Sequence, residues 1–230
     1  MTASYVARWE VAGVGGTVVA IDVVRAFTTA AYAFDAGAVE IWLVAGVQEA
    51  IDLAATMPGA LIMGEDHGAR PDGFDFSNSP VAVSRADLHG RSIVQRTSAG
   101  TAGVVAAVDA ERLFASSLVC ASATAAAIDR AGLGAPTYLI TGRFPDRPGG
   151  GEDDLVTAEL IERVRTGEDP RAAQTADAVL HSDEAARTLA LGHGDVDPDD
   201  IAYATDVDRF DFAMEVERTG GGLRLHQVWG

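Results

Sequence analysis

The clearest indication of the fold is the segment Thr17-Val18-Val19-Ala20-Ile21-Asp22-Val23-Val24-Arg25-Ala26. Its apolar run, residues 17–23, is typical of a strand that is buried on both faces of a sheet. The alanine-rich segment at residues 28–34 follows and predicts a helix. Strands that alternate with helices imply a largely parallel sheet with helices on both faces. We therefore expect a three-layer α/β/α fold with a largely parallel or mixed central sheet.

The same alternation continues to the end of the chain. Because 230 residues suit one large α/β unit, we expect a single domain spanning residues 1–230. Further strands are predicted at 40–44, 60–63, 92–95, 113–116 and 137–140, and helices at 47–57, 100–108, 122–131 and 152–165. Residues 166–191 look helical throughout, and residues 211–228 predict a hairpin around Gly220-Gly221-Gly222.

Charge and composition exclude several classes of protein. The formal net charge is -17, and all 17 basic residues are arginine. This balance argues against nucleic acid and against anionic membrane surfaces as partners. No apolar run reaches the roughly 18 residues of a membrane span, and residues 1–5 lack the basic start of a signal peptide. We expect a cytoplasmic protein with a small anionic ligand, and self-association into a homo-oligomer stays open.

The single cysteine, Cys120, excludes an internal disulfide and a cysteine zinc cluster. Its apolar surroundings predict a buried structural thiol. Several phosphate-handling machineries are also excluded. A Walker loop needs lysine, and Ala126 stands where a cysteine phosphatase needs arginine. Neither a Gly-x-Ser-x-Gly elbow nor a dinucleotide-binding glycine motif is present.

Ligands of parallel sheets bind at the carboxyl ends of the strands, so the loops there carry the functional signal. The first such loop holds Asp22 and Arg25. A charge inside an apolar run is costly unless it is paired or bound to metal. Two interpretations stay open: a structural Asp–Arg pair, or a metal ligand beside an anion clamp.

The second loop, residues 64–80, is rich in glycine, proline, aspartate and asparagine. Glu65 directly follows a strand, and Asn78 and Ser79 precede a proline. Helix capping explains these residues as well as function does, but long loops in compact domains are usually functional. His67 is either a general acid or ligand or, as loop histidines more often are, an exposed side chain.

The third loop is Arg96-Thr97-Ser98-Ala99-Gly100-Thr101, between a strand and a helix. Hydroxyl groups and free backbone N–H groups at a helix N-terminus bind anions well. An ordinary capped turn is the competing interpretation.

The fourth loop contains Gly142-Arg143 and ends at Glu152-Asp153-Asp154. The helix dipole alone favours acidic residues in a first turn. Three carboxylates beside a glycine-rich tract also suit Mg²⁺, which prefers oxygen ligands.

These four loops, in this order, resemble the 2-phosphosulfolactate phosphatase (ComB-like) family. The family's Ile-Asp-Val-x-Arg-Ala is matched at residues 21–26, and its Gly-Glu at 64–65. Its Gly-Phe-Asp-x-x-Asn-Ser-Pro is matched at 73–80, and its Glu-Asp at 152–153. Its Thr-Thr-Asn-Gly-Thr is matched in part at 97–101. The resemblance runs from about residue 18 to residue 206.

The resemblance implies a Mg²⁺-dependent phosphatase, a phosphoric-monoester hydrolase of coenzyme M biosynthesis that converts 2-phosphosulfolactate to sulfolactate and phosphate. It implies catalytic roles for Asp22, Arg25 and Glu65, and metal or general-base roles for Asp22, Glu65, Glu152 and Asp153. Arg25 and the loop at 97–101 would hold the phosphate, and Arg143 the acid group of the substrate. The substrate-binding residues implied are Asn78, Ser79, Thr97, Ser98, Gly100, Thr101 and Arg143.

Two positions depart from the family pattern. Ala99 and Cys120 each stand where the family has asparagine. The alternative function is therefore a binder of a small phosphorylated or sulfonated acid with little turnover. For the late acidic segment, residues 183–211, a solvated surface is favoured over a protein-docking face.

Overall fold

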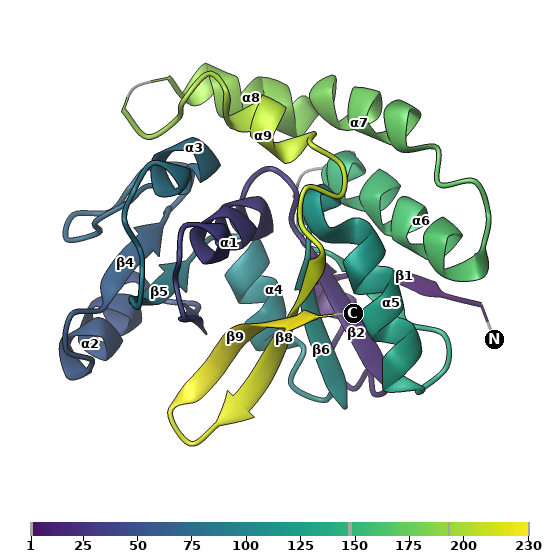
Figure 1. Ribbon diagram of the computed structural model, residues 1–230, viewed down its shortest axis with the longest axis horizontal. Coiled ribbons are helices and arrows are strands. Elements are labelled where there is room, and N and C mark those ends of the chain that lie inside the picture. The colour runs from purple at the N-terminus through teal and green to yellow at the C-terminus, as the bar shows by residue number, and fades with distance from the viewer. Residues whose placement is uncertain (1, 147–148, 193, 230) are drawn as a thin grey trace.

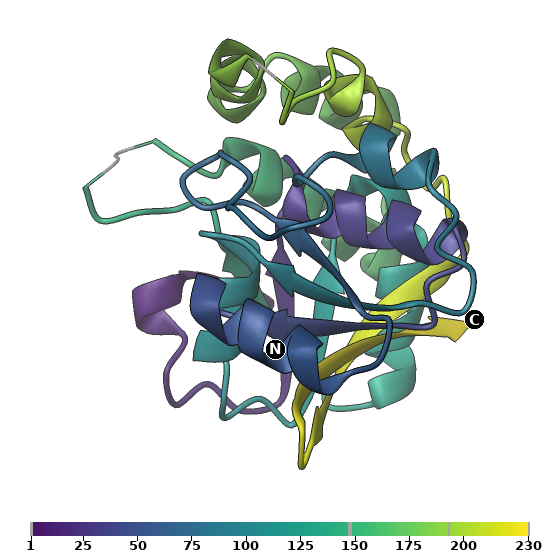
Figure 2. The same cartoon turned by 90° about the vertical axis from the view of Figure 1, so that its left-hand side faces the viewer.

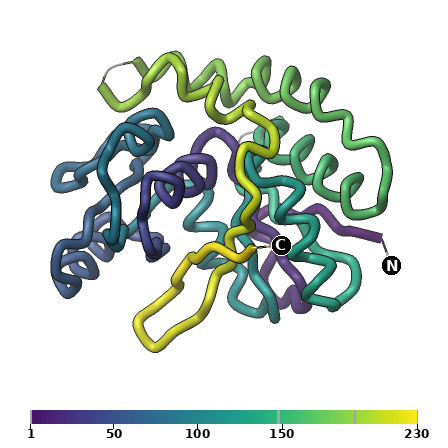
Figure 3. The backbone as a smooth tube through the Cα atoms, in the orientation of Figure 1, coloured from purple at the N-terminus to yellow at the C-terminus, as the bar shows by residue number. Residues whose placement is uncertain are grey.

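The computed structural model describes residues 2–146, 149–192 and 194–229 (Figures 1 and 3). Residues 147 and 148, in the loop that precedes Glu152, and residue 193 of the late acidic segment lie outside this description. The strands form one sheet, whose order along the sheet is β1 (Ser4–Ala7), β7 (Thr137–Ile140), β2 (Thr17–Ile21), β6 (Arg112–Ser116), β8 (Phe212–Thr219), β9 (Gly222–Trp229), β3 (Glu40–Val44), β5 (Ser92–Arg96) and β4 (Leu61–Gly64).

The sheet consists of two parallel blocks joined by an antiparallel hairpin. One block is β1-β7-β2-β6 and the other is β3-β5-β4. Between them, β8 pairs with β6 and β9 pairs with β3, both antiparallel. The hairpin closes where Thr219 pairs with Gly222. The predicted mixed sheet and the predicted terminal hairpin are therefore confirmed.

Helices cover both faces of this sheet, as expected. α1 (Ala26–Asp35) and α4 (Gly100–Ala106) share one apolar cluster with both parallel blocks and the hairpin, so the sheet bends around these two helices. The opposite faces carry α5 (Ala121–Ala131) and α6 (Glu152–Thr166) on one block and α2 (Val47–Thr56) on the other. Successive side chains of β2 point to opposite faces of the sheet. Val18 belongs to the apolar cluster around α1 and α4, and Val19 to the cluster that α5 and α6 cover.

Three helices lie across the ends of the strands: α7 (Ala172–Leu180), α8 (Asp183–Leu191) and α9 (Asp200–Ala204) (Figures 1 and 2). The prediction of continuous helix over 166–191 was wrong. Gly167, in a left-handed conformation at φ 74°, ends α6. The Ser182 side chain accepts the N–H of Ala185 and begins α8. None of the helices in the described residues is long and apolar enough to cross a membrane.

The short helix α3 (Pro80–Ser84) begins where helix capping was one interpretation of Asn78 and Ser79. The other short elements were not predicted from the sequence: β1, α9 and two 3₁₀ turns, Arg8–Glu10 and Leu118–Cys120. Cys120 is fully buried in the second of these turns, as its surroundings predicted. Burial raises the pKa of its thiol, which keeps it protonated and unreactive.

Candidate active site

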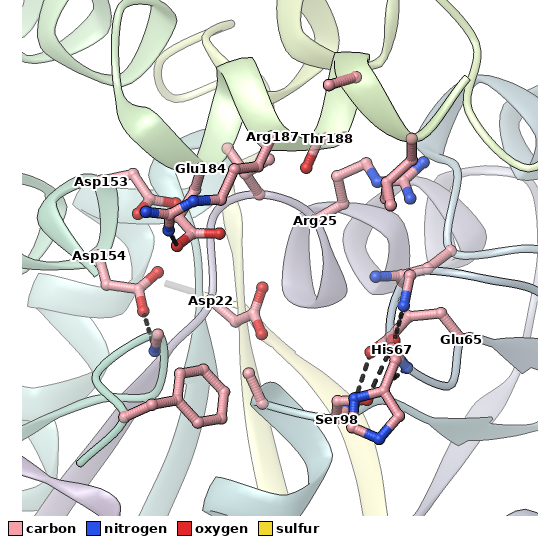
Figure 4. A pocket seen from close by; sticks show the side chains of 18 of the residues that line it. Asp22, Arg25, Glu65, His67, Ser98, Asp153, Asp154, Glu184, Arg187 and Thr188 are labelled. Carbon is pink, nitrogen blue, oxygen red and sulfur yellow. Dashed lines mark hydrogen bonds and ion pairs between the residues drawn. The ribbon is translucent and has the colours of Figure 1, made fainter. Parts of the chain in front are cut away.

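A cavity of about 760 Å³ opens where several strands end (Figure 4). The loops after β2, β4, β5 and β7 all contribute to its wall, so both parallel blocks reach it. Helix α8 covers it with Glu184, Arg187 and Thr188. The polar loops predicted to carry the chemistry therefore do converge at the carboxyl ends of the strands.

Three buried carboxylates form one side of this cavity. Asp22 follows β2, and Asp153 and Asp154 lie in the first turn of α6. Each is at most 7% exposed, and in Figure 4 all three side chains point into the same space. Buried carboxylates are costly unless neighbouring groups compensate their charge. Their partners therefore indicate what each one does.

Asp154 holds backbone in place. Its carboxylate accepts the N–H of Val23 at 3.0 Å and the N–H of Gly142 at 2.8 Å. These two residues belong to the loops after β2 and β7. Since its oxygens are engaged by backbone donors, Asp154 joins the two loops to the N-terminus of α6.

Asp22 has a different environment. Its Oδ1 accepts the N–H of Ala26 at 2.8 Å, which begins α1, and Thr141 Oγ1 lies 3.3 Å from Oδ2. Gly100, the first residue of α4, comes so close that a Cβ there would lie 2.7 Å from Asp22 Oδ2. Glycine at position 100 is thus required for the N-terminus of α4 to approach this carboxylate.

Asp153 is the least satisfied of the three. Its Oδ1 is buried and has no hydrogen-bond partner among the described residues. Burial, together with the negative charges of Asp22 and Glu184, raises the pKa of Asp153 to about 7. Burial also raises the pKa of Asp22 to about 6, with Glu65 adding to the effect, and it holds that of Asp154 well above its usual range. The site therefore favours either protons or a cation.

The opposite side of the cavity is built by Glu65 and Ser98. Glu65 accepts the N–H of Ser98 at 2.5 Å, the hydroxyl of Ser98 at 3.1 Å and the N–H of Gly68 at 2.7 Å. Within the same loop, Thr97 and Thr101 bond to each other, with Thr97 N donating to Thr101 Oγ1 at 2.7 Å. Glu65 thus fixes the loop that was predicted to bind an anion.

Arg25 lines the cavity but has a carboxylate partner already. Its Nη1 lies 2.6 Å from Oδ2 of Asp200 in α9, and both side chains are almost completely buried. Asp200 also accepts the hydroxyl of Ser79 at 2.6 Å. The peptide bond between Val24 and Arg25 is cis. A structural ion pair is therefore present, although its acid is Asp200 and not Asp22.

The structure gathers some of the predicted site residues and separates others. The predicted residues that line the cavity are Asp22, Arg25, Glu65, Asn78, Ser98 and Asp153. Thr97, Gly100 and Thr101 lie directly behind this wall, and Ser79 caps α3 by accepting the N–H of Ala82. Arg143 and the exposed Glu152 line a neighbouring cavity instead, beside Trp9. Their predicted roles gain no support from these positions.

Other residues of the cavity were missed from the sequence. Arg187 and Thr188 belong to α8, in the segment assigned to a solvated surface. Arg8 follows β1, a short edge strand without a polar loop after it. Phe144 and Asp146 come from the loop after β7. His67 lies at the rim with a side chain that is 91% exposed.

The donor atoms of the acidic wall suit a hard divalent cation. Among the described residues, no three histidine, cysteine, aspartate or glutamate side chains come together as a closed metal cage. Mg²⁺, however, commonly uses one or two carboxylates and completes its shell with water and substrate oxygens. The unpartnered Oδ1 of Asp153 and the charge repulsion between Asp153 and Asp22 fit this arrangement.

The fold and the cavity together define an α/β enzyme with a polar cavity at the carboxyl ends of its strands. Buried carboxylates stand on one side of the site, and on the other stands a loop whose N–H and hydroxyl groups are fixed by Glu65. Comparison with known proteins gives the family.

The sequence profile of the 2-phosphosulpholactate phosphatase family matches residues 6–219, and the chain belongs to this family. It is 32% identical over 211 residues to a probable 2-phosphosulfolactate phosphatase of Bacillus subtilis, covering 91% of each chain. The corresponding protein of Thermotoga petrophila is 30% identical over 207 residues, covering 84% of this chain and 86% of the relative. That of Thermoplasma acidophilum is 29% identical over 181 residues, covering 78% and 77%. The predicted family and enzyme class, a phosphoric-monoester hydrolase, are confirmed.

Proposed function

We propose that this protein is a Mg²⁺-dependent phosphatase that hydrolyses a phosphorylated 2-hydroxy acid, 2-phosphosulfolactate being the preferred substrate. The products are sulfolactate and inorganic phosphate, as a step of coenzyme M biosynthesis requires. One observation carries the proposal: the buried carboxylates Asp22 and Asp153 face the Glu65–Ser98 loop across a single cavity. This arrangement offers a cation-binding wall and an anion-binding wall to the same small ligand.

In this proposal Asp22 and Asp153 hold Mg²⁺, because their oxygens are buried and Asp153 Oδ1 lacks a partner. Mg²⁺ held by these two carboxylates would supply charge neutralisation for the phosphoryl group and would lower the pKa of a bound water molecule. Asp154 keeps the loops after β2 and β7 in register with that wall. Glu65 holds the Ser98 loop by accepting the N–H and hydroxyl of Ser98, so the phosphate oxygens would bind at the following residue, Ala99, at the N-terminus of α4.

Hydrolysis then requires that a water oxygen attack phosphorus while the ester P–O bond breaks. The alkoxide that leaves takes up a proton and becomes the hydroxyl of the 2-hydroxy acid. The helix α8 above the cavity, with Arg187 and Thr188, limits access of bulk water to the reacting group.

The test is hydrolysis of 2-phosphosulfolactate by the purified protein after treatment with a chelator, with and without added Mg²⁺. We expect turnover only with the cation. Asp22→Asn removes a charged oxygen with little change in shape, so we expect activity to fall at least about 100-fold while the fold is retained. Asp52→Asn, in the exposed part of α2, is the matched control and should keep full activity. Wild-type turnover by Asp22→Asn would show that Asp22 is not in the metal site.

A second candidate function is supported by Ala99, which lines the cavity where the family motif has asparagine. Without that amide, the same site could bind a phosphorylated or sulfonated acid and turn it over slowly. Absence of hydrolysis of any 2-hydroxy acid phosphate, combined with measurable binding of sulfolactate, would favour this alternative. Ala99→Asn would then be expected to increase turnover.

A further inference from the structure

Four arginines line the cavity, and three of them already have a carboxylate partner. Arg25 pairs with Asp200 at 2.6 Å, and Arg187 pairs with Glu184 at 2.5 Å. Arg96 pairs with Asp66 at 2.7 Å and also donates to the carbonyl of Glu65. Their positive charges are largely compensated within the protein.

Arg8 differs from these three. It forms no ion pair within the described parts of the chain, and its one hydrogen bond runs from Nη1 to the carbonyl oxygen of Ser98 at 3.3 Å. Its guanidinium lies over the ring of Phe144, 5.6 Å from the ring centre. Stacking on an aromatic ring covers one face of the guanidinium and leaves the N–H groups at its edge available to a ligand.

The position of Arg8 follows from the fold. β1 pairs in parallel with β7, so its carboxyl end lies at the same edge of the sheet as the loop that contains Phe144. Arg8 comes directly after β1 and reaches the Ser98 loop. It is therefore next to the loop that binds phosphate in the proposed function.

We propose that Arg8, stacked on Phe144, binds the acid group that the substrate carries in addition to its phosphate. The inference rests on the proposed function, which makes that group the carboxylate or the sulfonate of a phosphorylated 2-hydroxy acid. Both are oxyanions that a guanidinium edge can bind through two parallel hydrogen bonds. Arg8 thereby takes the role that the sequence suggested for Arg143, which lines the neighbouring cavity.

The same cavity contains Asp22, Glu65, Asp146, Asp153, Asp154 and Glu184. In such an acidic site, a second anionic group on the ligand needs a cation whose charge is not already compensated. Arg8 is the arginine that meets this condition. It thus determines selectivity for diacidic esters over simple phosphate monoesters.

The kinetic test compares Arg8→Gln with the wild type on three substrates. These are 2-phosphosulfolactate, 2-phospholactate, which lacks the sulfonate, and O-phosphoisethionate, which lacks the carboxylate. We expect KM to rise about 10- to 100-fold for substrates that carry the group bound by Arg8, with kcat changed less. KM for the substrate that lacks this group should hardly change in Arg8→Gln, so this substrate shows which group Arg8 binds. Arg8→Lys should recover part of the loss.

Two other variants serve as controls. Arg130→Gln removes the same charge from the exposed end of α5 and should leave all three KM values unchanged. Arg143→Gln tests the competing assignment. Three results would overturn the inference. KM of Arg8→Gln could rise equally for all three substrates, it could stay unchanged for all three, or the selective rise in KM could occur in Arg143→Gln instead.

A binding experiment separates this inference from the proposed function. Calorimetric titration with sulfolactate, lactate and isethionate needs no turnover. If the wild type hydrolyses no ester but binds sulfolactate, and Arg8→Gln weakens that binding about 10-fold or more, the role of Arg8 stands and the phosphatase proposal fails. If sulfolactate binds equally to both proteins, or to neither, the role of Arg8 is wrong whatever the activity.

Discussion

Asp154 accepts the backbone N–H of Val23 at 3.0 Å across a separation of 131 residues. The same carboxylate accepts the N–H of Gly142, so the loops after β2 and β7 are joined through one side chain of α6. Asp153, the preceding residue of the helix, is thereby placed beside Asp22. The acidic wall of the cavity depends on this connection.

Replacement of Asp154 by alanine leaves one buried and one partly buried backbone N–H group without an acceptor. Each unsatisfied group costs about 1–3 kcal/mol, so we expect the free energy of unfolding to fall by about 2–6 kcal/mol in urea denaturation. Activity should fall as well, because Asp22 and Asp153 lose their relative position. Glu152→Ala, at the same helix N-terminus but exposed, should cost less than about 1 kcal/mol. Equal stability of the two variants would contradict the role of Asp154.

Much of the architecture could be predicted because the pattern of the central strands is strong. β2 is buried along its whole length, and its apolar run is typical of a strand in the interior of a sheet. The ends of such strands are also where chemistry is expected. Asp22, Glu65, Ser98 and Asp153 could therefore be chosen as candidates from their sequence positions, and the structure places all four around one cavity.

The remaining parts depend on long-range contacts that no local pattern encodes. Arg25 could be assigned a pair but not its partner, since Asp200 lies 175 residues away. Arg8 follows a four-residue strand at the sheet edge, which carries too little apolar pattern to be detected. Arg187 lies on an amphipathic helix, and its exposure depends on where that helix packs.

The buried ion pair between Arg25 and Asp200 gives a second prediction. Asp200→Ala leaves the guanidinium of Arg25 buried without its partner, which typically costs about 3–5 kcal/mol of unfolding free energy. The exposed neighbour Asp199 provides the control, and Asp199→Ala should change stability by less than about 1 kcal/mol. A double-mutant cycle with Arg25→Ala should show strong coupling between the two positions. Additive effects would mean that the pair does not act as a unit.

Glu65 allows the anion-binding loop to be tested separately. In Glu65→Gln, the amide group can accept fewer hydrogen bonds than the carboxylate, so a donor from Ser98 or Gly68 loses its partner. We expect about a 10-fold weaker inhibition by inorganic phosphate and a loss of about 1–3 kcal/mol of stability. Asp66→Asn, at the next position, affects partly exposed contacts with Arg96 and with the exposed His67, and it should cost less than about 1 kcal/mol. Unchanged phosphate inhibition in Glu65→Gln would show that this carboxylate does not organise the loop.

The raised pKa of Asp153 predicts how stability depends on pH. In the folded protein its pKa is about 7, whereas an unfolded chain has an aspartate pKa of about 3.9. The folded state therefore binds the proton more tightly. As pH rises from about 4 through 7, the unfolded state releases the proton first, and the contribution of Asp153 to stability falls until its folded-state pKa is passed.

Asp153→Asn removes this titration while keeping the size of the side chain. The amide oxygen can still accept the backbone N–H groups at the start of α6. The variant has no charge at the buried Oδ1 position, which has no partner among the described residues. In chelator-treated protein we expect the variant to be more stable than the wild type at pH 8, by an amount on the order of 1–3 kcal/mol. The difference should shrink toward pH 4, where the wild-type carboxyl is protonated in both states.

Added Mg²⁺ should raise the melting temperature of the wild type at pH 8 and leave that of Asp153→Asn almost unchanged, because a cation compensates the carboxylate charge that the variant lacks. A wild-type protein that is as stable as the variant at pH 8 without the cation would mean that Asp153 carries no buried charge there.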